Sequence, residues 1–121
     1  MRGEIITHKD LVLYRKSVVF VSSIYKKTQS FPDEDRFGLI SQLRRASISI
    51  PTNIAEGSGR HSSRELIRFL YIAMGSISEI ETLLQISRNL SYVDSKSFNR
   101  LNEELTELRK MTSSLIYSLK T

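Results

Sequence analysis

The sequence contains no cysteine and no long hydrophobic run. Without cysteine, the chain can form no disulfide, no thiolate-bound metal site and no cysteine nucleophile. Uninterrupted apolar runs are short, with four residues in LVLY and in VVFV and six in FLYIAM, whereas a membrane-spanning helix needs about 20. The opening residues, MRGEIITHKD, carry charge and lack the apolar core of a secretory signal. We therefore expect a soluble, cytoplasmic protein that does not enter a membrane.

Residues suited to catalysis are also scarce. The chain has two histidines, His8 and His61, and no Glu-x-x-His pair of the kind that holds metal ions in helical bundles. It has neither a G-x-S-x-G elbow nor a Walker loop, and the stretch EGSGR lacks the lysine of a phosphate loop. His61 and Ser62 are adjacent, but no acid is evidently placed to orient the histidine. The pattern predicts a non-enzymatic protein with no metal and no cofactor.

Apolar residues recur with helical spacing throughout a single domain, residues 1–121. One set follows Asp94 and Ser95, either of which can cap a helix. Its spacings of three and four are typical of bundle packing: Phe98, Leu101, Leu105, Leu108, Thr112, Leu115 and Leu119. Another set follows Ser62 and Glu65, which have the spacing of a capping box: Leu66, Phe69, Ala73, Ile77, Ile80 and Leu84.

Two further helices are predicted at about 10–29 and 35–58, which gives an all-α, antiparallel, up-down-up-down four-helix bundle. The apolar arc of the first spans about 160°, wider than a surface helix needs, and indicates contact with a second helix or another subunit. The helix predicted at about 35–58 contains Pro51, which removes a backbone hydrogen bond. Its apolar side, including Phe37, stays in phase across Pro51, so we predict one helix kinked there. Gly57 and Gly59 are predicted to supply the following turn.

Positive charge is concentrated in one part of the sequence. The chain carries a net charge of +5, and residues 36–68 contain six arginines but only two acids. The arrangement is either a solvated rim or a surface that contacts phosphates, near a helix start that favours anions. No aromatic residue is expected within it, so base stacking is not indicated. The residues predicted to gather near one end and form this surface are Arg45, Arg60, His61, Arg64 and Arg68. Lys26 and Lys27 of the first helix are predicted to contact phosphates as well.

Three other charged residues are predicted to form structural ion pairs. Arg44 falls on the apolar arc of its helix, so we expect it to face inward and to bind Glu79 or the backbone of the third helix. In an antiparallel hairpin that turns near Arg60, Glu56 is expected to lie near Arg64.

The stretch from Gln42 to Leu84, QLRRASISIPTNIAEGSGRHSSRELIRFLYIAMGSISEIETLL, resembles the signature of the four helix bundle protein family. Members of this bacterial family are also known as 23S rRNA intervening-sequence proteins. The later segment VDSKSFNRLNEELTELRKMTSSLIYSLK fits as well, so the resemblance covers nearly the whole chain. It implies a compact bundle that assembles as a ring-like homopentamer. A relative in the superfamily, the accessory protein of diversity-generating retroelements, assists a reverse transcriptase by binding protein and nucleic acid.

The residues and the resemblance together predict a non-enzymatic, oligomeric protein that binds structured RNA or DNA through phosphate contacts. The alternative is a protein–protein scaffold or accessory subunit, for example of a reverse transcriptase, that does not touch nucleic acid. In that case the acidic face formed by Glu103, Glu104 and Glu107 would matter more than the arginines.

Overall fold

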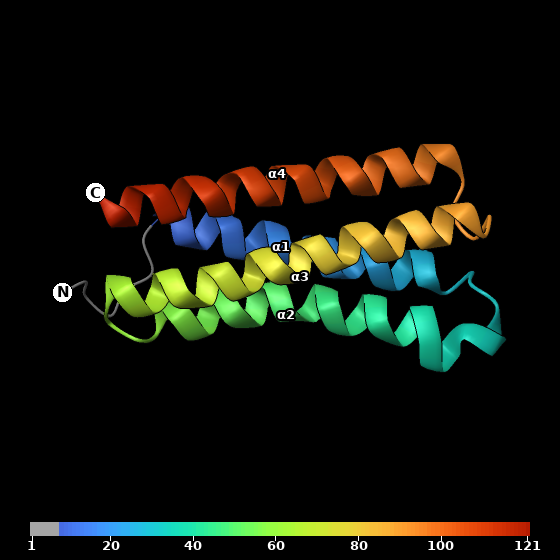
Figure 1. Cartoon of the computed structure of the whole chain (residues 1–121), viewed down its shortest axis with the longest axis horizontal. Coiled ribbons are helices and arrows are strands. Elements are labelled where there is room, and N and C mark those ends of the chain that lie inside the picture. The colour runs from blue at the N-terminus through green and yellow to red at the C-terminus, as the bar shows by residue number, and fades with distance from the viewer. Residues whose placement is uncertain (1–7) are drawn as a thin grey trace.

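The computed structural model describes residues 8–121, which form four long helices (Figure 1). The helices are α1 (His8–Thr28), α2 (Ser41–Ser58), α3 (Ser63–Asn89) and α4 (Ser95–Lys120). A 3₁₀ turn, η1 (Asp33–Asp35), and a wider π-type turn, η2 (Arg36–Ile40), connect α1 to α2. The described part of the chain contains no strand. The expectation about a secretory signal concerns the opening residues, most of which lie outside the described part.

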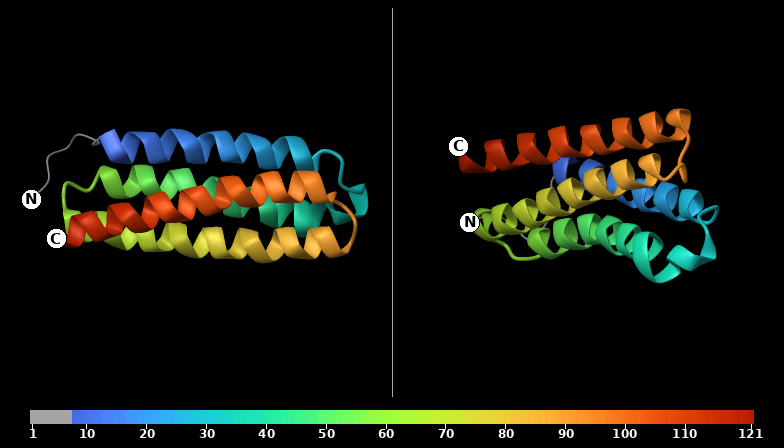
Figure 2. Two further views of the ribbon diagram at one scale, coloured as in Figure 1. Left: turned by 90° about the horizontal axis from the view of Figure 1, so that it is seen from above. Right: turned by 45° about the vertical axis from the view of Figure 1, so that its right-hand side comes forward.

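The helices run alternately up and down and pack in the order of the chain (Figures 1 and 2). α2 packs against α1 and α3, α3 packs against α4, and α4 returns to α1. The α2–α3 turn therefore lies at one end of the bundle, and the α1–α2 and α3–α4 connections lie at the other. The predicted all-α, antiparallel, up-down-up-down bundle is confirmed. Among the described helices, none is both long and apolar enough to cross a membrane.

The core is built from the apolar stripes that the spacing predicts. Leu101, Leu105 and Leu108 of α4 are at most 1% exposed. Thr112 continues their seam, and its buried hydroxyl donates to the carbonyl of Leu108 at 2.7 Å, so burial leaves no unsatisfied polar atom there. α3 contributes the matching stripe of buried residues: Leu66, Phe69, Ala73, Ile77, Ile80 and Leu84.

The wide apolar arc of α1 is only partly covered within one chain. Leu13, Phe20 and Ile24 are buried in the core. On the adjoining side, Val18 remains 40% exposed and Val19 61% exposed. α1 therefore keeps two valines that the described chain covers only in part, and we call this pair the apolar strip.

Pro51 is buried within α2, and the helix runs through it from Ser41 to Ser58. Proline has no N–H to donate to the carbonyl four residues back. The next two residues supply extra side-chain donors: Thr52 Oγ1 binds the Ile48 carbonyl at 2.9 Å, and Asn53 Nδ2 binds the Ser49 carbonyl at 2.8 Å. One continuous helix is thus present, and the bend at Pro51 stays a prediction.

The backbone departs from helical geometry before α2, at Gly38, where φ is −109° and ψ is −110°. This irregular turn takes Phe37 out of the register of α2. The prediction that Phe37 belongs to the apolar side of that helix is wrong, because its side chain is 91% exposed.

The turn between α2 and α3 also differs from the prediction that Gly57 and Gly59 supply it. Gly57 lies buried inside α2, and a Cβ there would stand 2.8 Å from Phe69 Cβ and 2.9 Å from Leu66 Cδ1. Glycine is needed at this position for close helix packing. Gly59 does lie at the turn, as the C-cap of α2, with an ordinary φ of −80°, while His61 adopts the left-handed φ of 58°.

Candidate nucleic-acid interface

Four of the predicted contact residues lie together around the α2–α3 turn: Arg60, His61, Arg64 and Arg68. We call this set the arginine corner. All four side chains are exposed. Ser62 positions the start of α3 beneath them, since its hydroxyl accepts a hydrogen bond from the Glu65 N–H at 3.4 Å. This bond is the first half of the predicted capping box.

Acidic neighbours neutralise part of the arginine corner. Arg60 pairs with Glu56 at 2.9 Å, one helical turn earlier, and Arg68 pairs with Glu65 at 3.5 Å. Glu56 was predicted to lie near Arg64, and the ion pair that it forms in the structure is with Arg60. Exposed pairs of this kind contribute about 0–1 kcal/mol to stability, so a stronger anionic ligand can compete for both arginines.

Phe69 lies beneath two of these arginines. The guanidinium carbon of Arg60 is 5.2 Å from the centre of the Phe69 ring, and that of Arg68 is 4.6 Å away. Such cation–π contacts hold the guanidinium groups over the ring. The expectation that no aromatic residue lies in the cluster is wrong, but Phe69 is only 8% exposed. It supports the arginines and offers no face for a base to stack on.

Arg64 differs from its neighbours because no described acidic side chain lies within ion-pair distance of it. It stands in the first turn of α3. The free N–H groups and positive dipole end of a helix N-terminus add to the charge of an arginine placed there. Arg64 is therefore the most strongly anion-attracting member of the arginine corner.

Arg45 faces outward, as predicted, but it lies away from the arginine corner. The 15 residues that separate it from Arg60 in sequence correspond to about 22 Å of helix. Arg45 lines a shallow, polar pocket between α2 and α3 together with Ser49, Ser76 and Glu79. The expectation that all these arginines gather near one end is therefore wrong, since a continuous α2 holds Arg45 at a distance.

Lys26 and Lys27 lie at the opposite end of the bundle, in the last turn of α1. They line a groove of about 470 Å³ between α1 and α4, which we call the α1–α4 groove. Lys27 Nζ donates to the Ser97 hydroxyl at 3.3 Å across this groove. Its complete lining is Ser23, Lys26, Lys27, Ser97, Arg100 and Glu104.

The structural role predicted for Arg44 is present, but its partner is different. Arg44 Nε donates to Thr28 Oγ1 at 2.9 Å, an Nη donates to the Tyr25 carbonyl at 3.4 Å, and the guanidinium lies 4.4 Å from the Tyr25 ring centre. These contacts tie α2 to α1. The predicted pair with Glu79 or the α3 backbone is wrong, because Arg44 binds α1 instead, whereas Glu79 of α3 is exposed and lines a pocket with Arg45.

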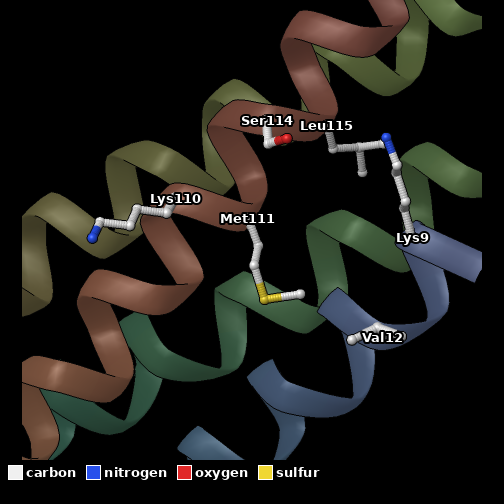
Figure 3. A pocket seen from close by; sticks show the side chains of 6 residues that line it. All are labelled: Lys9, Val12, Lys110, Met111, Ser114 and Leu115. Carbon is white, nitrogen blue, oxygen red and sulfur yellow. The ribbon is translucent and has the colours of Figure 1, made fainter.

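A more apolar pocket of about 370 Å³ lies between the start of α1 and the end of α4 (Figure 3). Met111 extends from α4 toward the α1 turn that carries Val12, whereas Lys110 points to one side. Among the described residues no cluster of His, Asp and Glu could hold a metal ion. His8 begins α1, and its side chain lies outside the described part.

These observations define the protein first as a small antiparallel four-helix bundle with cationic side chains near both ends. Residues 9–114 match the family described as 23S rRNA-intervening sequence protein, and the chain belongs to that family. The bundle is similar to a crystal structure from Bacteroides thetaiotaomicron VPI-5482, a protein with unknown function from the S23 ribosomal protein family. The TM-score is 0.81 and the identity 29%, over 93% of this chain and 99% of that chain. A search of curated proteins found no match.

Proposed function

We propose that this protein is a non-enzymatic, oligomeric bundle that binds structured RNA or DNA through phosphate contacts. The observation that carries the proposal is Arg64, an exposed guanidinium at the N-terminus of α3 that has no ion-pair partner among the described residues. Arg60, His61 and Arg68 flank it, and Arg45 extends the cationic surface along α2. The family description refers to 23S rRNA, which makes fragments of that RNA the first nucleic acid to test.

The geometry favours backbone contacts over base recognition. Arginine forks match phosphate oxygens in two-point contacts. The aromatic ring in the arginine corner is buried beneath the arginines, so binding is expected to depend on salt and only weakly on sequence.

The proposed assembly is a homopentamer in the cytoplasm. Its physical support is the apolar strip on α1, where Val18 and Val19 remain exposed in a single chain. An apolar strip of this kind, next to a filled core, favours contact with another copy. Sedimentation of the full chain would measure the subunit number, and a monomer would contradict this part of the proposal.

The binding proposal is tested by removing charge at the arginine corner. Arg64→Gln/Arg68→Gln should weaken retention of 23S rRNA fragments and duplex DNA on filters by about tenfold or more at low salt, as two phosphate contacts are lost. Arg15→Gln/Lys110→Gln is the matched control, because it removes the same charge from exposed positions elsewhere on the bundle. Equal losses in both variants, or no retention by the wild type, would contradict the proposal.

Phe37 favours a second candidate function, that of a protein–protein scaffold or accessory subunit. A phenylalanine that is 91% exposed is costly in water and is typical of contact surfaces. A reverse transcriptase is one partner that fits this proposal. Phe37→Ser should then abolish partner capture while Arg64→Gln/Arg68→Gln leaves it intact, and the reverse result would favour nucleic-acid binding.

A further inference from the structure

The α1–α4 groove brings together cations from two helices at the end of the bundle remote from the arginine corner. Lys26 and Lys27 come from the last turn of α1, and Arg100 comes from the second turn of α4. No described acidic side chain lies within ion-pair distance of any of them. In this respect the groove is less neutralised than the arginine corner, where two arginines have carboxylate partners.

The groove also contains hydroxyl groups set between its charges. The Ser97 hydroxyl accepts from Lys27 Nζ at 3.3 Å, and the Ser23 hydroxyl donates to Glu104 at 3.3 Å. Lysine, arginine and serine donors that surround a concavity of about 470 Å³ can satisfy oxygens that point in several directions. A tetrahedral oxyanion needs such a set, whereas a flat charged surface contacts one side of it.

Glu104 is the carboxylate that lines this groove. Burial raises its pKa, against the opposing influences of the Ser23 hydrogen bond and the Arg100 charge, while Glu107 raises it further. Glu107 is itself paired with Lys16 at 3.1 Å, and Asp94 lies close enough to Lys27 for their charges to interact. The groove therefore combines three cations with one lining carboxylate, Glu104.

We propose that the α1–α4 groove is a second phosphate-binding site, in which Lys26, Lys27 and Arg100 hold the oxyanion and Glu104 opposes it. The site takes either free phosphate or a phosphate of nucleic acid, and the nucleic-acid source rests on the proposed function. Because the two sites lie at opposite ends of helices about 40 Å long, one chain then holds two phosphate groups that are far apart.

Two substitutions with opposite expected effects test the groove. Lys26→Gln/Arg100→Gln should weaken the binding of inorganic phosphate, followed by ³¹P NMR at constant ionic strength, by about tenfold as two charges near the anion are lost. Glu104→Gln should strengthen it about threefold, because the substitution removes one repelling charge at about 6 Å in a water-like dielectric. Arg15→Gln/Lys110→Gln, which also removes one cation each from α1 and α4, should leave phosphate affinity unchanged.

The same variants separate the two phosphate sources. If phosphate comes from nucleic acid, Lys26→Gln/Arg100→Gln also weakens filter retention of RNA or DNA; if phosphate is free, retention is unchanged. In either case Arg64→Gln/Arg68→Gln should keep the affinity for inorganic phosphate at this groove, even where nucleic-acid binding is lost. Equal effects of the groove variant and its matched control, or no gain from Glu104→Gln, would overturn the groove as a site. Loss of phosphate binding in the arginine-corner variant would overturn it too.

Discussion

At the scale of single residues, two glycines within helices show how differently one residue type can act. Gly57 is buried where α2 meets α3, and Phe69 and Leu66 occupy the space that a side chain would need. Gly75 lies on the exposed side of α3, and a Cβ added there would meet nothing within 4 Å. The same substitution should therefore have opposite effects on stability at the two positions.

Gly57→Ala should lower the free energy of unfolding by about 1–3 kcal/mol, the usual cost of forcing an extra group into a packed core. The contact with the α3 backbone at Leu66 Cα, 3.3 Å from the added Cβ, leaves little room for relaxation. Urea unfolding followed by circular dichroism measures the change. An unchanged midpoint would show that α2 and α3 can separate at no cost.

Gly75→Ala should raise the free energy of unfolding by about 0.5–1 kcal/mol in the same measurement, because alanine loses less backbone entropy in a helix. The gain in stability is expected where the surface of α3 around Gly75 faces water. A loss of stability or of assembly on substitution would instead show that another molecule approaches α3 closely at Gly75.

At the scale of elements, each end of a helix depends on a few polar contacts. Asp94 caps α4, and its Oδ1 accepts a hydrogen bond from the Ser97 N–H at 2.7 Å. This backbone hydrogen bond lowers the pKa of Asp94, helped by the nearby charges of Lys27 and Arg88. Because the charged form is favoured in the folded state, the contribution to stability is present above the usual pKa of aspartate and lost as pH falls through the lowered value.

Asp94→Ala should lower the melting temperature at neutral pH, and the difference from wild type should shrink as pH falls below the usual pKa of aspartate and the carboxyl takes up its proton. Asp94→Asn is the matched control, since it keeps an oxygen acceptor for the Ser97 N–H and loses only the charge. The melting temperature of Asp94→Asn should lie between that of the wild type and that of Asp94→Ala. A difference that stays the same in acid would show that the charge of Asp94 does not contribute.

The elements also show which features the sequence could predict. Spacing of apolar residues located all four helices, since periodicity depends only on which side of a helix is buried. It could not predict the partner of Arg44, because a residue at the edge of an apolar arc can face either neighbouring helix. In the structure Arg44 faces α1, where it donates to Thr28 Oγ1 and to the Tyr25 carbonyl, and it does not bind α3. Phe37 was misplaced for a similar reason, because the irregular backbone at Gly38 shifts the register.

The arrangement of the candidate site could be predicted only in part. Arg45 and the arginine corner are exposed, as predicted, yet a continuous α2 places Arg45 far from the turn, and α1 carries Lys26 and Lys27 to the other end. Arg100 and Glu104 were not assigned to the basic site, because α4 is distant from α1 in the sequence and lies beside it only in the folded bundle. No periodic pattern within one helix could have shown that neighbourhood.

At the scale of the whole molecule, cations that have no acidic partner among the described residues are distributed along the length of the bundle. Arg64 stands at one end, Arg45 on the side of α2, and Lys26 and Lys27 at the other end. This distribution suits an extended polyanion better than a single small ligand. The number of phosphates contacted together then determines how strongly salt weakens binding.

The most direct test of phosphate binding is the slope of log affinity against log salt concentration for a 23S rRNA fragment or duplex DNA. For about six phosphate contacts on duplex DNA, the slope is about −5 and the affinity falls by about 10³ between 50 and 200 mM salt. Arg64→Gln/Arg68→Gln should make the slope shallower by about 2. A slope near zero for the wild type, or an unchanged slope in this variant, would contradict the account.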